Sequence, residues 1–132
     1  MIKKLQVKTS HRTEMIDVTS KVQAALVESK LTSGVCTIYV PHTTAAVTIN
    51  ENADPSVRRD ILEFLEKNIP HSAAYHHTEG NADSHIKASL VGSSTSVLFE
   101  EGKLMLGTWQ GIFFCEFDGP RQRQVWLKLT GD

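Results

Sequence analysis

The last third of the chain consists of short strand-like segments separated by tight turns, and this pattern restricts the fold more than any other feature. Turn signals stand at Glu101-Gly102 and at Asp118-Gly119-Pro120. Turns this short connect antiparallel neighbours, because a parallel pair needs a crossover of a dozen or more residues. This third predicts an antiparallel sheet with strands at residues 96–99, 103–106, 111–117 and 122–129.

The first two thirds add further strands and two main helices. A first helix is predicted to begin at Thr19 or Ser20 and to end near Ser33-Gly34. Asp54 followed by Pro55 predicts the start of a second helix, because Asp is a favoured N-cap and Pro suits the first helical position. Residues 71–84 are predicted to form a polar loop, with one or two helical turns after it. The other predicted strands are residues 2–8, 14–18, 35–40 and 45–50.

This order of elements does not alternate strand and helix along the chain. It predicts an α+β fold of two packed, mainly antiparallel β-sheets (a sandwich) with two main helices, in a single domain over residues 1–132. The composition agrees, since 40% hydrophobic and 22% charged residues are ordinary values for a globular protein. A net charge of −1 gives no electrostatic footprint for nucleic acid or a membrane surface.

The two cysteines, Cys36 and Cys115, lie in apolar, strand-like surroundings without the spacing of a metal motif. We expect them to be reduced thiols packed as small hydrophobic side chains. The N-terminus has lysines but no apolar segment after them, and no apolar run is long enough to span a bilayer. We therefore expect a soluble, cytoplasmic protein with neither nucleic acid nor a membrane as partner.

Five of the six histidines fall between His42 and His85, together with several carboxylates. His42 follows a strand break at Pro41 and precedes two threonines, so we expect its side chain at a sheet edge. The alternative is a turn in which a threonine bonds its own backbone. Glu51 ends a buried-looking strand, where it could bind a divalent cation, act as a general base or form an ordinary ion pair.

The segment from Tyr75 to His85 is the densest in polar groups, with three histidines and two carboxylates. These side chains suit metal ions, imidazole for transition metals and carboxylate for magnesium. The alternative is a solvated loop in which Asp83 or Ser84 caps a short helix. Further along, two glycines bracket Trp109-Gln110, which predicts either an aromatic wall with a binding amide or ordinary core packing.

Four strings carry a resemblance to a known family. They are Pro41-His42-Thr43-Thr44, Thr48-Ile49-Asn50-Glu51-Asn52-Ala53-Asp54-Pro55, Glu79-Gly80-Asn81-Ala82-Asp83-Ser84-His85-Ile86-Lys87 and Gly107-Thr108-Trp109-Gln110-Gly111-Ile112. In this order they resemble the YjbQ-like family, also called the secondary thiamine-phosphate synthase family. The resemblance implies two packed β-sheets with two main helices and a homotrimer around a threefold axis. It also implies a polar pocket near the subunit interface.

The implied activity joins hydroxymethylpyrimidine diphosphate to a thiazole phosphate with loss of diphosphate, and it is expected as a weak side activity. Mg²⁺ would be held by Glu51 and Asp83, phosphate oxygens would face Lys87 and Arg121 or Arg123, and Trp109 would stack on the pyrimidine. The expected catalytic residues are Glu51, His77, Asp83 and His85. The expected substrate contacts are His42, Asn52, Asn81, Lys87, Trp109 and Gln110.

Two alternatives stand beside this expectation. The first is a metal-dependent enzyme, such as a hydrolase of a phosphorylated small molecule, with Zn²⁺ or another transition metal on His42, His77 and His85. The number of histidines suits this chemistry better than it suits the synthase. The second is a non-catalytic trimeric module that binds an anionic metabolite.

Overall fold

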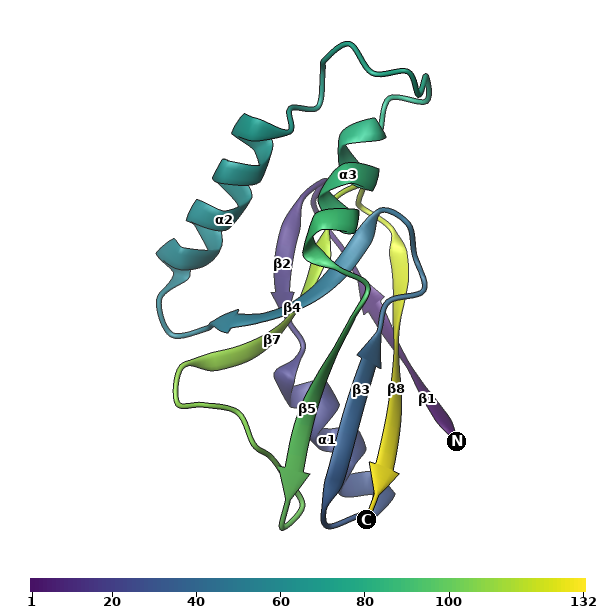
Figure 1. The fold of residues 1–132 in the computed structure, drawn as a ribbon, viewed down its shortest axis with the longest axis vertical. Helices are drawn as coiled ribbons and strands as arrows, with labels where there is room; N and C mark the ends of the chain where they lie inside the picture. Colours follow the sequence, from purple (N-terminus) through teal and green to yellow (C-terminus); the bar gives the residue numbers. More distant parts are fainter.

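Two antiparallel sheets form the body of the computed structural model, which describes residues 1–132 (Figure 1). The five-stranded sheet has the order β1-β8-β3-β5-β6, and the three-stranded sheet has the order β2-β7-β4. Every strand pair is antiparallel, so the predicted α+β sandwich is confirmed. The strands are β1 (Ile2–Lys8), β2 (Glu14–Asp17), β3 (Gly34–Tyr39), β4 (Ala45–Glu51), β5 (Ser94–Glu100), β6 (Lys103–Leu104), β7 (Gln110–Glu116) and β8 (Gln122–Gly131).

Three helices complete the fold: α1 (Thr19–Ser29), α2 (Pro55–Asn68) and α3 (Ala82–Val91). The predicted start of α2 is confirmed, since Oδ1 of Asp54 accepts a hydrogen bond from the backbone N–H of Ser56 at 2.9 Å. Helix α1 ends at Ser29, so the prediction that it reaches Ser33-Gly34 was wrong. Lys30 takes a left-handed backbone conformation with φ of 62°, and this ends the helix.

Helix α3 begins earlier than the sequence predicts, because residues 82–84 belong to its first turn and not to the preceding loop. Asp83 and Ser84 are fully buried inside this turn and Asn81 is the N-cap, so the alternative in which one of them caps the helix from a solvated loop was wrong. Their polarity hid the helix, but each has a buried partner. The hydroxyl of Ser84 donates to the carbonyl oxygen of Phe117 at 2.6 Å, and Asp83 forms ion pairs with Arg12 and Lys87.

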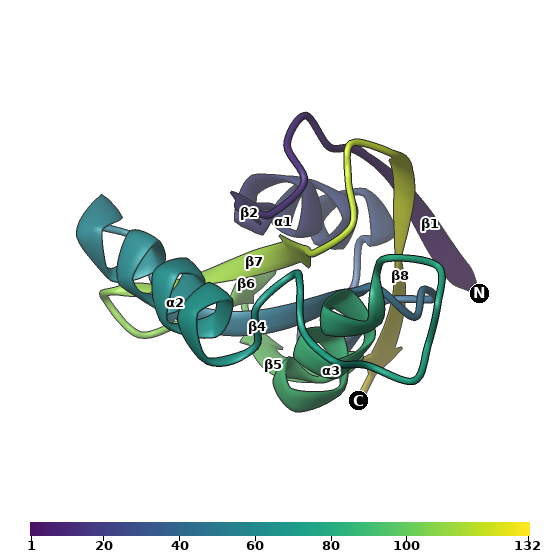
Figure 2. The same cartoon turned by 90° about the horizontal axis from the view of Figure 1, so that it is seen from above.

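The three-stranded sheet is buried on both faces, which explains why the sequence of its central strand β7 is almost uniformly apolar. Ile112 and Phe114 point into the larger core, which also contains residues of α1 and the five-stranded sheet. Phe113 and Cys115 point the other way, into a smaller core covered by α2 and α3. Figure 2 shows α1 on one side of β7 and the other two helices on the opposite side. The fold therefore places α3 directly over β4.

Helix α2 lies at the edge of the molecule and contains no fully buried residue. It contacts the smaller core through Ile61, Leu62 and Leu65, while Phe64 remains 66% exposed. The loop after α2 curves around α3 (Figure 2). No helix in the structure has the length and apolar character that crossing a membrane would demand.

Candidate functional site

A hollow of about 430 Å³ lies where the β3–β4 loop, the start of α3 and the β7–β8 loop meet, and we call it the polar hollow. None of its ten lining residues is hydrophobic, which is unusual for a small-molecule pocket. Such a lining suits a charged or strongly hydrogen-bonding ligand. The residues are Pro41, His42, Thr43, Thr44, Glu79, Asn81, His85, Asp118, Arg121 and Arg123.

His42 is held in one tautomer by strand β8. The backbone N–H of Gln124 donates to Nε2 of His42 at 3.0 Å, so this nitrogen must carry a lone pair. Burial and the nearby charge of Arg123 lower the pKa of His42 below its usual 6.5. The imidazole is therefore neutral near pH 7, with its proton on Nδ1.

A buried ion pair forms the floor of the polar hollow. Nε of Arg123 donates to Oε1 of Glu116 at 2.9 Å, and Nη2 of Arg123 donates to Oγ1 of Thr44 at 2.8 Å. The same carboxylate accepts from the hydroxyl of Thr9 at 2.8 Å and from the backbone N–H of Asp118 at 3.0 Å. These contacts fix the two loops that surround the hollow. They also neutralise Arg123, which leaves its charge little available to a ligand.

Arg121 and Asn81 form the rim of the hollow. Nη2 of Arg121 contacts Oδ2 of Asp118 at 2.8 Å, but the Arg121 side chain is 53% exposed. Nδ2 of Asn81 donates to the same Asp118 oxygen at 2.8 Å, whereas Oδ1 of Asn81 is buried without a hydrogen-bond partner. Arg121 is therefore the cation best placed to meet an anion.

A second hollow of about 410 Å³ lies beside the first, and we call it the apolar hollow. Its surface is mostly carbon, and its lining residues are Ala74, Tyr75, His76, His77, Ala82, His85 and Ile86. The rings of His77 and His85 meet edge to face with centroids 5.2 Å apart. His85 lines both hollows.

The three histidines expected to bind a transition metal do not form a ligand group in this chain. No group of three or more His, Cys, Asp or Glu side chains is placed to hold a metal ion. His42 is a poor metal ligand here, because its Nε2 already accepts the hydrogen bond from the backbone N–H of Gln124. His77 contacts His85 from the side of the apolar hollow.

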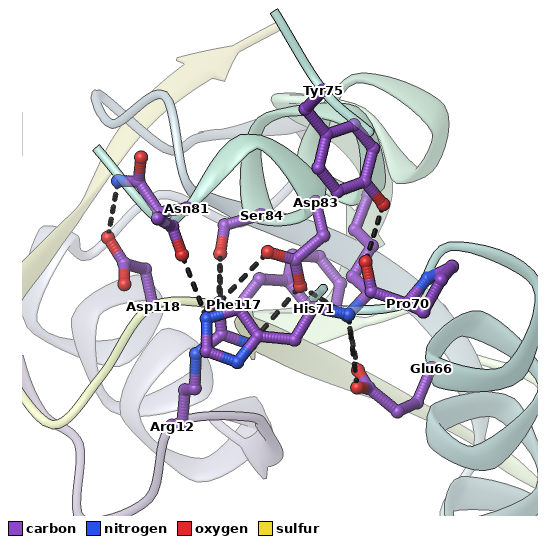
Figure 3. Close-up of polar contacts among 12 residues, drawn as sticks. Arg12, Glu66, Pro70, His71, Tyr75, Asn81, Asp83, Ser84, Phe117 and Asp118 are labelled. Carbon is purple, nitrogen blue, oxygen red and sulfur yellow. Dashed lines mark hydrogen bonds and ion pairs between the residues drawn. The ribbon is translucent and has the colours of Figure 1, made fainter. Parts of the chain in front are cut away.

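Asp83 and Lys87 belong to a chain of ion pairs that also includes Arg12 and Glu66, and we call these four residues the ion lock. Figure 3 labels Arg12, Glu66 and Asp83. Arg12 grips Asp83 with two hydrogen bonds, Nη1–Oδ2 at 3.1 Å and Nη2–Oδ1 at 3.0 Å. Nζ of Lys87 contacts Asp83 at 2.8 Å and Glu66 at 2.6 Å. The lock ties the β1–β2 loop to α2 and α3.

The ion lock corrects two expectations about the site. Asp83 is 0% exposed and Lys87 is 1% exposed, and neither lines the polar hollow. Burial by itself raises the pKa of Asp83, but hydrogen bonds from Arg12 and Lys87 outweigh this and lower it to about 2. A carboxylate and an ammonium that neutralise each other inside the fold cannot serve Mg²⁺ or a substrate phosphate.

A further group of expected site residues lies at the far end of β4. Glu51 pairs with Gln110 in the β4–β7 register, and the backbone N–H of Asn52 donates to the carbonyl oxygen of Trp109 at 3.0 Å. The strand from Ala45 to Glu51 spans about 20 Å at the usual rise per residue. These four residues, Glu51, Asn52, Trp109 and Gln110, are therefore separated from the polar hollow within one chain.

Sequence reasoning missed several residues that build the site. Arg12 carried no motif, and only the folded chain brings it to Asp83, 71 positions away. The sequence predicts Asp118 only as part of a turn. Glu116 did carry a signal, because a carboxylate within the apolar run Ile112–Phe117 needs a buried partner. Arg123, considered only as a phosphate ligand, is that partner.

Comparison with known proteins places this geometry in a family. A family model described as UPF0047 protein YjbQ-like matches residues 3–132. The chain belongs to this family. It is 54% identical to a UPF0047 protein of Methanocaldococcus jannaschii over 132 residues, which cover 100% of this chain and 96% of that one. It is 53% identical to the UPF0047 protein YugU of Bacillus subtilis, over 99% of this chain and 100% of that one.

Solved structures of similar proteins have the same fold. An uncharacterised family member from Clostridium acetobutylicum, 52% identical, superposes with a TM-score of 0.95 over 97% of this chain and 99% of that one. A hypothetical protein from Aeropyrum pernix, 39% identical, gives a TM-score of 0.95 over 100% of this chain and 99% of that one. The likeness to the YjbQ-like family that the four sequence strings indicate is thus confirmed over the whole chain.

Proposed function

We propose that the chain is a transferase of the thiamine-phosphate synthase type, which joins hydroxymethylpyrimidine diphosphate to a thiazole phosphate with release of diphosphate. One observation carries the proposal: a hollow with no hydrophobic lining residue presents Arg121, His42 and His85 together. A phosphorylated ligand is the small-molecule class that most needs such a lining.

The chemistry requires little of the protein beyond binding and charge stabilisation. The thiazole nitrogen supplies the electron pair of the new carbon–nitrogen bond, and the carbon–oxygen bond to diphosphate breaks with its electrons on the departing oxygen. The site must then stabilise the negative charge that develops on diphosphate. Arg121 and the Nδ1–H of His42 are donors for those oxygens, and His85 is a third polar group at the same hollow.

Oxygen ligands for Mg²⁺ also line the hollow, although they differ from those expected. The carboxylates of Glu79 and Asp118 replace Glu51 and Asp83 in this role. Mg²⁺ is typically held by one or two carboxylates together with substrate phosphates, and these lining oxygens match that type of coordination. When bound, the ion would neutralise part of the diphosphate charge.

A homotrimer in the cytoplasm is part of the same proposal. The Glu51–Gln110 end of β4 is too far from the polar hollow for one small ligand to contact both in a single chain, so a neighbouring chain would supply it. Cys36 and Cys115, both free and buried, suit a reducing compartment. Light scattering on purified protein is expected to give three times the mass of one chain. The mass of a single chain would refute the proposal that a neighbouring chain contributes to the site.

The binding half of the proposal is tested with inorganic diphosphate by calorimetry. Arg121→Gln and His42→Ala should each weaken diphosphate binding by about tenfold or more, because the first removes the positive charge and the second removes the Nδ1–H donor. Arg59→Gln is the matched control, since Arg59 is exposed on α2 outside the hollow. Equal affinities for all variants would refute the polar hollow as the anion site.

The catalytic half is tested by chromatography of the product formed from the two phosphorylated precursors with Mg²⁺. Product that disappears in Arg121→Gln supports the transferase. Diphosphate binding without product formation would refute the transferase and favour the non-catalytic anion-binding module. Stoichiometric zinc in the purified protein, with release of phosphate from phosphorylated small molecules, would favour the metal-dependent hydrolase.

A further inference from the structure

We propose that the apolar hollow is the subsite for a flat ring whose phosphate or diphosphate lies in the polar hollow. The ligand class is then a phosphate ester of a small planar ring, bound across His85. This inference rests on the proposed function for its phosphate end and adds the position of the ring.

The lining of the apolar hollow suits a ring. Its surface is mostly carbon, with Tyr75, His77 and Ile86 around it. Aromatic and imidazole faces stack on flat heterocycles, and an aliphatic side chain covers the remaining face. The contrast with the adjoining polar hollow, where no lining residue is hydrophobic, is the pattern expected for a ligand with one apolar end and one charged end.

His85 is where the linings of the two hollows meet. It is the only residue that lines both of them, and its ring meets His77 edge to face at 5.2 Å between centroids. A ligand that spans the boundary therefore passes over His85. Charge sets its direction, because Arg121 lies at the polar hollow only.

The loop wall of the apolar hollow is anchored by its own hydrogen bonds. The hydroxyl of Tyr75 donates to the carbonyl oxygen of Pro70, and Nε2 of His71 bonds the carbonyl oxygen of Gly80 at 2.8 Å (Figure 3). The His71 contact joins the two ends of the loop, and the Tyr75 contact ties the tyrosine ring to the residue that follows α2 and its cap. Trp109, the ring partner expected from the sequence, lies at the far end of β4 and does not reach this hollow.

Phenyl phosphate and methyl phosphate are the probes, since they share a phosphate and differ in the ring. Calorimetry on the unmodified protein should show phenyl phosphate binding about tenfold more tightly, from burial of ring surface. Equal affinities would overturn the ring subsite while leaving the phosphate site standing. If neither probe binds, both the ring subsite and the phosphate site are refuted.

Two matched pairs of variants locate the ring. Ala74→Asp and Ile86→Asn should abolish the advantage of phenyl over methyl phosphate, because each puts a polar group in the apolar hollow. Ala73→Asp and Leu90→Asn, on the neighbouring loop position and one helical turn further along α3, should keep it. Arg121→Gln should weaken both probes and preserve their ratio. A ring advantage that survives in both Ala74→Asp and Ile86→Asn would overturn the proposal.

Discussion

The backbone N–H of Gln124 donates to Nε2 of His42 at 3.0 Å, so strand β8 occupies one of the two ring nitrogens of this histidine. The other nitrogen, Nδ1, is the one left for a ligand. Because a backbone N–H can only donate, this contact favours the neutral imidazole and fixes its tautomer. His42 is therefore suited to donate one hydrogen bond and poorly suited to bind a metal.

The tautomer of His42 is directly measurable. In long-range ¹H–¹⁵N spectra at neutral pH, the ring should show the Nδ1–H pattern. Its titration should be centred below the ordinary 6.5, because burial and Arg123 disfavour the cation. The His42→Gln variant assigns the resonance. An Nε2–H pattern would contradict the structure.

Removing the charge of Asp83 should destabilise the protein strongly. Asp83→Asn leaves the buried Lys87 with only Glu66 as its partner, and breaking a buried ion pair typically costs about 3 kcal/mol of unfolding free energy. Glu63→Gln is the control, because Glu63 is an exposed acid on α2 that forms no ion pair. Urea denaturation of both variants measures the difference. A loss of stability no larger than that of Glu63→Gln would contradict the ion lock.

The same carboxylate should make stability depend on pH in acid. Folding lowers the pKa of Asp83 from 3.8 to about 2, so its contribution is fully present above 3.8 and is lost as pH falls through about 2. The loss amounts to about 2 kcal/mol. Urea midpoints at about pH 5 and about pH 2.5 should therefore differ more for the unmodified protein than for Asp83→Asn. Equal differences would show that Asp83 is not the group responsible.

The two thiols should be unreactive in the native protein. Burial raises the pKa of Cys36 to about 11 and that of Cys115 to about 12, so neither forms the thiolate that reacts. A chromogenic disulfide reagent should therefore label no thiol at mildly alkaline pH and two thiols after denaturation. Rapid labelling of a thiol in the native protein would contradict its burial and indicate that the surrounding core opens readily.

Most elements could be predicted because their signals are local. The alternation in β8 and the Asp54-Pro55 pair at α2 depend only on neighbouring residues. Helix α3 was underestimated because Asp83 and Ser84 look like loop residues until their buried partners are known. The left-handed end of α1 at Lys30 carried no glycine to mark it.

The site was harder to predict because it depends on contacts between distant segments. The sequence indicated that His42, Asn81 and His85 share a site, and the fold brings them to one hollow. It could not indicate that Asp83 is neutralised by Arg12, since no local pattern connects the two. Nor could it show that Trp109 lies at the opposite end of β4, because that distance comes from strand length and sheet register.

The ion lock also bears on the order in which the chain assembles. Arg12, Glu66 and Asp83 come from three distant segments, so their contacts require α2 and α3 to lie in their native positions. Interactions that form after the folding transition state slow unfolding and leave the folding rate almost unchanged. We therefore expect the lock to slow unfolding and so to lengthen the lifetime of the folded chain.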